Sequence, residues 1–171
     1  MKTISKKDLV GKYWDNRWEY ISYVISILPE VEKVLEIGSN GVPIVKDCDT
    51  MDIVQFDGLT YLADAREPFH FKNKEYDLLI ALQTWEHLYD DEKHSIGSRQ
   101  KEAFKEVQRV SKEAIISFPY KWTVRMRKDD CHYNIDEEKI AEWTGNLPYK
   151  SKKIIESLGG RRNRIIYHWV F

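Results

Sequence analysis

The stretch VEKVLEIGSNGVPIVKD, residues 31–47, decides how the rest of the chain can be interpreted. Its first half is short, apolar and rich in β-branched side chains, which is typical of a buried strand. The strand stops at Gly38, and Gly41 follows closely, so the backbone can turn there at positive φ. Asn40 stands between the two glycines, and asparagine tolerates the left-handed region better than most residues. This pattern fits a ligand-binding turn and also a plain corner between a strand and a loop.

The segment after Gly41 is too short for an ordinary crossover between parallel strands. Residues 42–50 contain Pro43 and two aspartates, so they can form one helical turn at most. Parallel neighbours usually need a crossover of about a dozen residues or more. Few residues also remain between Asp57 and the next strand, so we expect two missing crossover helices. One sheet face would then lose part of its cover, which would favour self-association as a homodimer.

Hydrophobic periodicity predicts an α/β fold with a Rossmann-like, mostly parallel sheet and a C-terminal antiparallel hairpin. With 171 residues, we expect a single domain over 1–171, with residues 1–30 as an N-terminal helical lid or cap. Strands are expected at 33–37, 51–56, 60–64, 76–82 and 113–118, helices at 10–28, 98–111 and 136–145, and the hairpin at 149–171 around Gly159 and Gly160.

Composition excludes several classes of protein. The chain is 42% hydrophobic and 32% charged, which indicates a globular protein. Its net charge of -1 gives no basic field for nucleic acid, and no apolar run approaches the ~20 residues that span a membrane. Cys48 and Cys131 have no metal-type spacing, so we expect no metal and reduced thiols in a cytoplasmic protein.

Four segments, read in order, resemble the motifs of class I S-adenosylmethionine-dependent methyltransferases of the type 11-like group. They are VLEIGSNG, VQFD, LADAREPFHFKNKEYDLLIALQTWEHL and FKEVQRVSKEAIISFPY, and together they cover roughly residues 31–120. The later segment DDCHYNIDEEKIAEW is similar to one that precedes the last two strands in this family. Their order and spacing make the resemblance specific, and it implies a compact form that uses S-adenosyl-L-methionine as its cofactor.

The resemblance implies a set of residues at the cofactor. Asp57, 19 positions after Gly38, would accept hydrogen bonds from both ribose hydroxyls, although an ordinary Asp-Gly turn explains it equally well. Asp64 would accept from the adenine amino group beside the Ala65 N–H, or it could simply form a turn. The remaining positions are Glu36 near the ammonium group, the turn residues Gly38, Ser39, Asn40 and Gly41, Gln83 near the methionine part, and Tyr13 and Arg17 as a lid.

Two histidines are candidate bases for the transfer itself. His87 and His132 lie in segments expected beyond the carboxyl ends of strands, where doubly wound sheets hold ligands. Methyl transfer is an in-line displacement, so the protein mainly positions the acceptor and can remove its proton. A lone histidine is also commonly structural, and that alternative stays open for both.

The resulting functional hypothesis is S-adenosylmethionine-dependent methyl transfer to a small polar acceptor. We expect the accepting atom to be an oxygen of a sugar or secondary metabolite. The alternative is a non-catalytic methyltransferase-like module for binding or assembly, which the missing helices favour. A nicotinamide-dependent Rossmann enzyme fits poorly, because no long helix follows the glycine turn.

Overall fold

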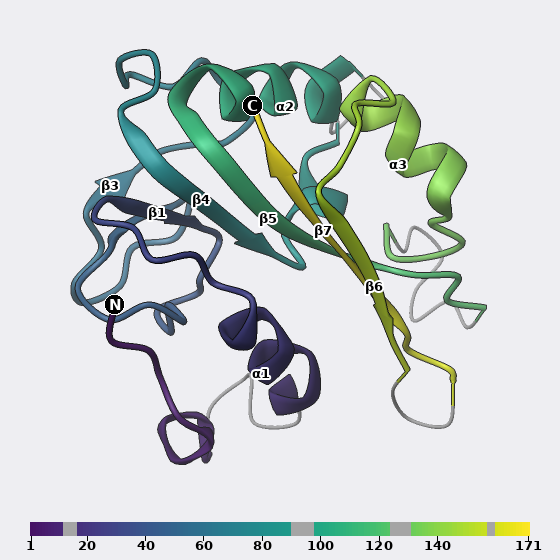
Figure 1. Cartoon of the computed structure of the whole chain (residues 1–171), viewed down its shortest axis with the longest axis horizontal. Helices are drawn as coiled ribbons and strands as arrows, with labels where there is room; N and C mark the ends of the chain where they lie inside the picture. Colours follow the sequence, from purple (N-terminus) through teal and green to yellow (C-terminus); the bar gives the residue numbers. More distant parts are fainter. Residues whose placement is uncertain (12–16, 90–97, 124–130, 157–159) are drawn as a thin grey trace.

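The computed structural model of the chain describes residues 1–11, 17–89, 98–123, 131–156 and 160–171. Within these residues, seven strands form one sheet in the order β3-β2-β1-β4-β5-β7-β6 (Figure 1). The strands are β1 (Val34–Ile37), β2 (Asp49–Asp52), β3 (Tyr61–Leu62), β4 (Tyr76–Leu82), β5 (Ser111–Pro119), β6 (Ser151–Ile155) and β7 (Arg164–Val170). The helices are α1 (Trp18–Ser26), α2 (Ser98–Val110) and α3 (Glu137–Thr144), with 3-10 turns η1 (Lys6–Leu9) and η3 (Trp85–His87).

The pairing directions confirm the predicted sheet. All pairs from β3 through β2, β1 and β4 to β5 are parallel. β7 is antiparallel to both of its neighbours, β5 and β6, and so forms the expected C-terminal hairpin with β6. The parallel strands place all their carboxyl ends at one edge of the sheet, which is where ligands bind in this type of fold.

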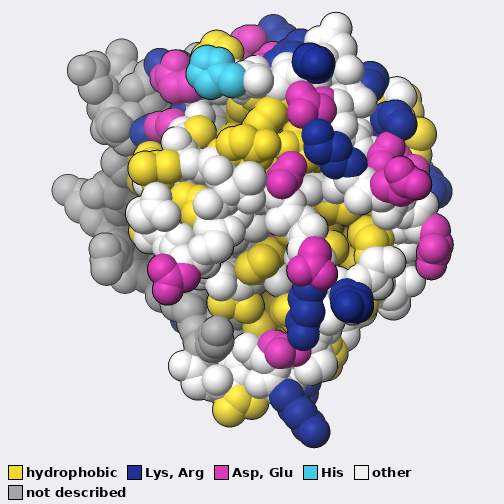
Figure 2. All heavy atoms as spheres, turned by 90° about the vertical axis from the view of Figure 1, so that its left-hand side faces the viewer, with side chains coloured by type: hydrophobic (Ala, Val, Ile, Leu, Met, Phe, Trp, Pro, Cys, Tyr) yellow, Lys and Arg dark blue, Asp and Glu magenta, His cyan; other side chains and the backbone are white. Residues whose placement is uncertain are grey.

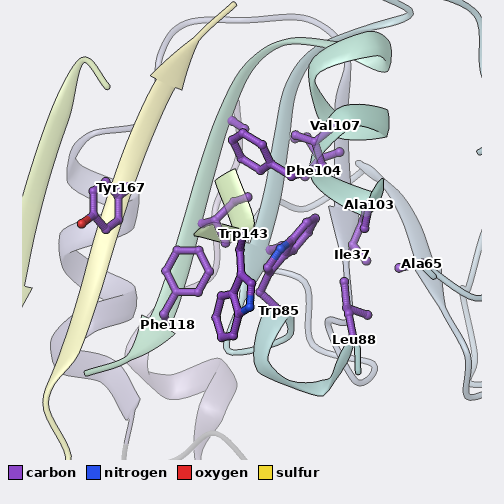
Figure 3. Packing of buried hydrophobic residues seen from close by; sticks show 14 of the residues in the cluster. Ile37, Ala65, Trp85, Leu88, Ala103, Phe104, Val107, Phe118, Trp143 and Tyr167 are labelled. Atoms are coloured by element: carbon purple, nitrogen blue, oxygen red, sulfur yellow. The ribbon is translucent and has the colours of Figure 1, made fainter. Parts of the chain in front are cut away.

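Alternating side chains along the strands form two cores, one on each face. On one face, α2 and α3 cover a large cluster that includes Trp85, Phe104, Phe118 and Trp143. Figure 3 shows part of this cluster, in which aromatic rings from the helices and the strands gather. Trp85 is fully buried and meets the Phe104 ring edge-on at 6.3 Å. These large rings bury much apolar area per residue and hold η3 and α2 against the sheet.

The second core lies on the opposite face, beneath α1 (Figure 1). Tyr20, Ile21 and Val24 of α1 pack on the buried side chains of β4 and β5 that belong to this second core. The N-terminal segment completes this cover, because Leu9 is fully buried and the Ile4 N–H donates to the Ile44 carbonyl at 3.0 Å. The N-terminal segment therefore covers the part of this face that lies beside the helix-free crossover.

The first predicted helix is shorter than its periodicity suggested. α1 begins at Trp18, and Val10 is 68% exposed after η1. The prediction of a helix that starts at Val10 is therefore wrong. Residues 12–16 lie outside the described residues. The boundaries of α3 are confirmed: the Asp136 side chain accepts from the Lys139 N–H at 2.9 Å, and Gly145 ends the helix in the left-handed region.

Both crossover helices predicted to be missing are missing. Residues 38–48 connect β1 to β2 and residues 53–60 connect β2 to β3, and neither segment contains a helix. The first segment is held against the sheet by Glu36, whose buried carboxyl oxygen Oε2 accepts from the Ile44 N–H at 2.8 Å. This bond ties the segment to β1, and the buried side chains of Ile44 and Val45 add apolar packing in place of a helix.

The β3 edge retains some exposed apolar surface. Ile53, Val54 and Leu62 are each more than half exposed there. Figure 2 faces this edge and shows apolar side chains scattered among groups of both charges. Self-association as a homodimer stays a prediction. None of the described helices has the length and apolar run that a bilayer crossing requires. Neither cysteine forms a disulfide, as expected.

The buried Glu36 should make the protein less stable as the pH rises. Burial raises the pKa of Glu36 to about 8, from an ordinary value of 4.5, because the charged form loses its hydration. Its contribution to stability is complete below pH 4.5 and is lost as the pH rises through 8. Between these values the folded protein keeps a proton that the unfolded chain has released. We expect this group to lower the free energy of unfolding by on the order of 3–5 kcal/mol between these limits.

The variant Glu36→Gln tests this, because an amide oxygen can still accept from Ile44 and cannot ionise. Its free energy of unfolding, measured with urea from pH 5 to pH 9, should depend less on pH than that of the wild type. The matched control is Glu32→Gln, which changes an exposed acid on the same segment. Parallel pH curves for the wild type and both variants would contradict the role of Glu36.

Candidate functional site

A cavity of about 460 Å³ opens at the carboxyl ends of β1, β2, β3 and β4. Its volume lies within the ~300–1,000 Å³ typical of sites for small organic molecules. Eight of the predicted site residues line it: Arg17, Gly38, Asn40, Asp64, Ala65, Gln83, His87 and His132. The other lining residues are Ile37, Asp52, Ile53, Val54, Ala63, Arg66, Thr84, Leu88, Tyr89 and Trp122.

Position 38 requires glycine, both because of its backbone conformation and because of the side chain packed against it. Its φ is +71°, and a Cβ atom there would lie 2.3 Å from the Thr84 hydroxyl oxygen. Thr84 follows β4, and its hydroxyl lies 3.3 Å from the Ile37 and Leu82 carbonyls. The close approach of these two chain segments brings the end of β1 against the end of β4 and forms the floor of the cavity.

The rest of the glycine turn adopts the left-handed conformations that its residues favour. Asn40 has φ of 49° and Gly41 has φ of 76°. The Asn40 N–H donates to Oδ2 of Asp52 at 3.1 Å, so the turn is tied to the end of β2. Ser39 is buried, and neither it nor Gly41 is among the residues that line the cavity. The turn therefore presents Gly38 and Asn40 to a ligand.

Asp52 occupies the position for which Asp57 was predicted. β2 ends at Asp52 instead of continuing to residue 56, and Asp57 lies in an exposed turn outside the cavity lining. Oδ1 of Asp52 accepts from the Val54 N–H at 3.0 Å, which fixes the carboxylate at the strand end. Asp52 comes only 14 positions after Gly38 (52 − 38), because the crossover has no helix. A search at the usual spacing of about 20 therefore selects Asp57, which does not line the cavity, in place of Asp52, which does.

Asp64 follows β3 and is held by Arg66. Both of its carboxylate oxygens receive hydrogen bonds from the Arg66 guanidinium, at 2.7–3.0 Å. This guanidinium, together with the Arg66 backbone N–H, lowers the pKa of Asp64, so the group is an oriented carboxylate. Ala65, the next residue, also lines the cavity. Asp64 and Ala65 therefore both face the cavity, and their contact with an adenine stays a prediction.

Gln83 adopts a strained backbone conformation at the end of β4, with φ of 54°. Its N–H lies 3.0 Å from the Ser117 hydroxyl, and its side-chain amide nitrogen lies 3.2 Å from the same oxygen. These contacts with β5 fix Gln83 at the cavity wall. Arg17, at the start of α1, also lines the cavity, whereas Tyr13 lies outside the described residues.

Glu36 does not reach the cavity. Its carboxyl group is buried on the side of the glycine turn that faces α1, against Tyr20, Ile21 and Ile44. The carboxyl accepts from the Ile44 N–H and so holds the crossover. In this position Glu36 does not line the cavity, so it is not placed for the predicted contact with a cofactor ammonium group.

The cavity is also lined by three neighbouring rings, those of His87, His132 and Trp122, which we call its histidine end. His87 is presented by η3, which is anchored by the fully buried Trp85 beside it. The His132 ring stacks on Trp122 with a centroid distance of 5.3 Å and an interplanar angle of 12°. The structure therefore brings the two candidate bases together, with ring centroids 4.8 Å apart.

The sequence analysis missed several residues of this site. Asp52 could have been found by shortening the expected spacing to match the missing crossover helix. Arg66, Thr84 and Trp122 carry no motif of their own, and they enter the site through contacts made only in the folded chain. Cys131 is the immediate neighbour of His132, and the spacing of the two cysteines gave no reason to select it.

The strand order, the reversed β7 and the ligand cavity at the carboxyl edge define the class I S-adenosylmethionine-dependent methyltransferase fold. No protein-family model matches the sequence, and no similar sequence was found among curated proteins. Solved structures, however, match this fold along most of the chain. At the identities found, this likeness concerns the fold alone.

Three of these structures illustrate the likeness. The N-methyltransferase NodS from Bradyrhizobium japonicum, in complex with S-adenosyl-L-homocysteine, is 12% identical with a TM-score of 0.66, over 95% of this chain and 89% of NodS. A SAM-dependent methyltransferase from Aquifex aeolicus is 10% identical with a TM-score of 0.59, over 98% and 100%. One from Methanosarcina mazei is 12% identical with a TM-score of 0.57, over 87% and 97%.

The contact between Gly38 and Thr84 predicts that Gly38→Ala will be more harmful than an ordinary change of glycine in a turn. Alanine must adopt the left-handed region, which costs roughly 1–2 kcal/mol, and must also displace Thr84. Gly58→Ala is the matched control, because Gly58 has φ of +82° and open space where the added methyl group would lie. Denaturant unfolding should show the larger loss for Gly38→Ala; equal losses would contradict the packing role.

Proposed function

We propose that this protein is an S-adenosylmethionine-dependent methyltransferase that acts on a small polar acceptor, at an oxygen of a sugar or secondary metabolite. The observation that carries the proposal is the combination of groups that line one cavity. Asp52, Asp64 and two residues of the glycine turn line it together with two histidines. The first set suits a nucleoside with hydroxyl and amino groups, and the histidines suit an acceptor that must lose a proton.

The chain supplies a donor and acceptor set that fits S-adenosylmethionine. The Asp52 carboxylate, fixed at the end of β2, is the group for the two ribose hydroxyls. Asp64 and the Ala65 N–H would contact the adenine, and Gly38 and Asn40 of the glycine turn also line the cavity. Gln83 and Arg17 would contact the methionine part, with the Arg17 guanidinium as the partner of its carboxylate.

The transfer needs little from the protein beyond position and proton removal. S-adenosylmethionine, when bound, supplies an electrophilic methyl group on a sulfonium. The cavity walls hold the acceptor in line with that group, and this positioning lowers the entropic part of the barrier. His87 and His132, which line the cavity, can take up the proton that a hydroxyl acceptor loses.

A second candidate function is a non-catalytic module that binds the cofactor or a partner. The missing crossover helices favour it, since residues 38–48 and 53–60 retain only loops beside the cavity. The two functions differ in one measurable property. A methyltransferase converts S-adenosylmethionine to S-adenosylhomocysteine when an acceptor is supplied, whereas a binding module holds either compound without turnover.

Binding of S-adenosylhomocysteine should depend on Asp52 and not on Asp57. A hydrogen-bonded charged group contributes about 1.5–3 kcal/mol, so Asp52→Asn should weaken binding about 10- to 100-fold. Asp57→Asn, the matched control in the exposed turn, should bind as the wild type does. Isothermal calorimetry measures both affinities, and the melting temperature without ligand reports whether the turn itself is disturbed.

The opposite ranking of these two variants would overturn the assignment of Asp52. The wild type should also show a concentration-dependent rise in melting temperature with S-adenosylhomocysteine, and none with NAD. If neither S-adenosylhomocysteine nor S-adenosylmethionine raises the melting temperature, the proposed function is overturned. Binding without transfer of a labelled methyl group to any of a panel of sugars and phenols would support the non-catalytic module.

The role of Arg17 is tested by a ligand that lacks the carboxylate. Arg17→Ala should lower the affinity for S-adenosylhomocysteine about tenfold or more, because a charged hydrogen bond is lost. The same variant should leave the affinity for 5′-methylthioadenosine unchanged, since that compound has no amino-acid part. Equal effects on both compounds would show that Arg17 acts on the shape of the cavity and not on the carboxylate.

A further inference from the structure

Three potential metal ligands converge at the histidine end of the cavity. His87, Cys131 and His132 place one ligand atom each within 4.8 Å of one another, and no other such group occurs among the described residues. The Cys131 sulfur lies 3.3 Å from Nδ1 of His87 and 3.6 Å from Nδ1 of His132. Two residues of the cluster also line the cavity.

The two sulfur–nitrogen distances match the corresponding edges of a tetrahedral zinc site. With Zn–S near 2.3 Å and Zn–N near 2.0–2.1 Å, a tetrahedral arrangement separates the sulfur from each nitrogen by roughly 3.5 Å. Both sulfur–nitrogen distances in the cluster lie within about 0.2 Å of that value. The nitrogen and sulfur ligands are also those that zinc prefers, whereas magnesium and calcium take oxygen ligands.

The groups around the cluster resemble the outer shell of a metal site. Oε1 of the buried Glu86 lies 3.8 Å from Nε2 of His132, on the side of the ring opposite to the nitrogen that faces Cys131. A carboxylate behind a ligating histidine orients the ring and raises its basicity. Trp122 stacks on the same ring and is itself fixed by a 2.7 Å bond from its Nε1 to the Asn163 carbonyl.

We propose that His87, Cys131 and His132 form a zinc site with three protein ligands and one open position on the cavity side. Binding forms three metal–ligand bonds, and the Cys131 thiol loses its proton to the buffer. Three protein ligands with an open fourth position are the arrangement of catalytic zinc sites. For the acceptor, this rests on the proposed function: a hydroxyl oxygen bound at the open position would have a lowered pKa and would release its proton to solvent. His87 and His132 would then act as zinc ligands and not as bases.

The test uses the purified full-length chain, stripped with a chelator and then titrated with ZnCl₂ or CoCl₂ under reducing conditions. One equivalent of metal should bind, and the cobalt form should show a thiolate-to-metal absorption band and the intense visible bands of tetrahedral coordination. Calorimetry in two buffers with different ionisation heats should register about one proton released per zinc.

Variants locate the site. Cys131→Ser and His132→Ala should weaken zinc binding by more than the roughly 10- to 100-fold that the loss of an outer-shell partner costs. Glu86→Gln should fall within that smaller range. Cys48→Ser is the matched control, because Cys48 is the other cysteine of the chain, and its cobalt spectrum should equal that of the wild type.

Each result decides the proposal independently of methyl transfer. Less than one equivalent of tightly bound zinc, or a cobalt spectrum without the thiolate band, would overturn it. So would equal zinc affinities for Cys131→Ser and Cys48→Ser. The affinity of Cys131→Ser for S-adenosylhomocysteine serves as a folding control, so a failure of the metal site and a failure of the cofactor site remain distinguishable.

Discussion

The hydrogen bond from the Ile44 N–H to the buried Glu36 carboxyl is the constraint on which the site depends. Parallel strands β1 and β2 are joined by only residues 38–48, without the helix that normally packs such a crossover on the sheet. The buried carboxyl ties this segment to β1, and Ile44 and Val45 of the segment pack in the second core. Because burial opposes the charged form, the Glu36 carboxyl is favoured in its protonated state, and its raised pKa makes the fold less stable at high pH.

Once the crossover is held in this way, the positions around it follow. The Ile44 carbonyl is left to pair with Ile4, so the N-terminal segment covers the face that the missing helix would have covered. The shorter path also brings β2 to its end after fewer residues, which places Asp52 beside Asn40 at the cavity. Local stability and the shape of the ligand site thus have one physical origin.

The residues that line the cavity are held in different ways. Asp52 and Gln83 are fixed by backbone bonds at strand ends. The two histidines are fixed by aromatic packing, because buried Trp85 anchors His87, and Trp122 stacks on His132. This second arrangement brings a thiol between two imidazoles, a combination with a clear preference for a borderline-soft metal ion.

The sequence by itself determined the features that depend on local chemistry. It predicted the strands along the chain, the left-handed turn around Asn40, the ends of α3, and the lack of two crossover helices, because each follows from residue type and spacing. It could not determine which aspartate ends β2, since Asp52 and Asp57 are both acidic residues near a turn. Only the pairing of β1 with β2 fixed that point.

Tertiary structure alone decided the role of Glu36 and the meeting of His87 with Cys131. Glu36 looked like a ligand-facing acid, and the fold turned it toward Ile44 instead. His87 and Cys131 are 44 positions apart, so no motif spacing connects them. They meet because the loops that follow β4 and β5 emerge at the same edge of a parallel sheet. Contacts between such loops depend on strand order and register, which are properties of the whole fold and not of any segment.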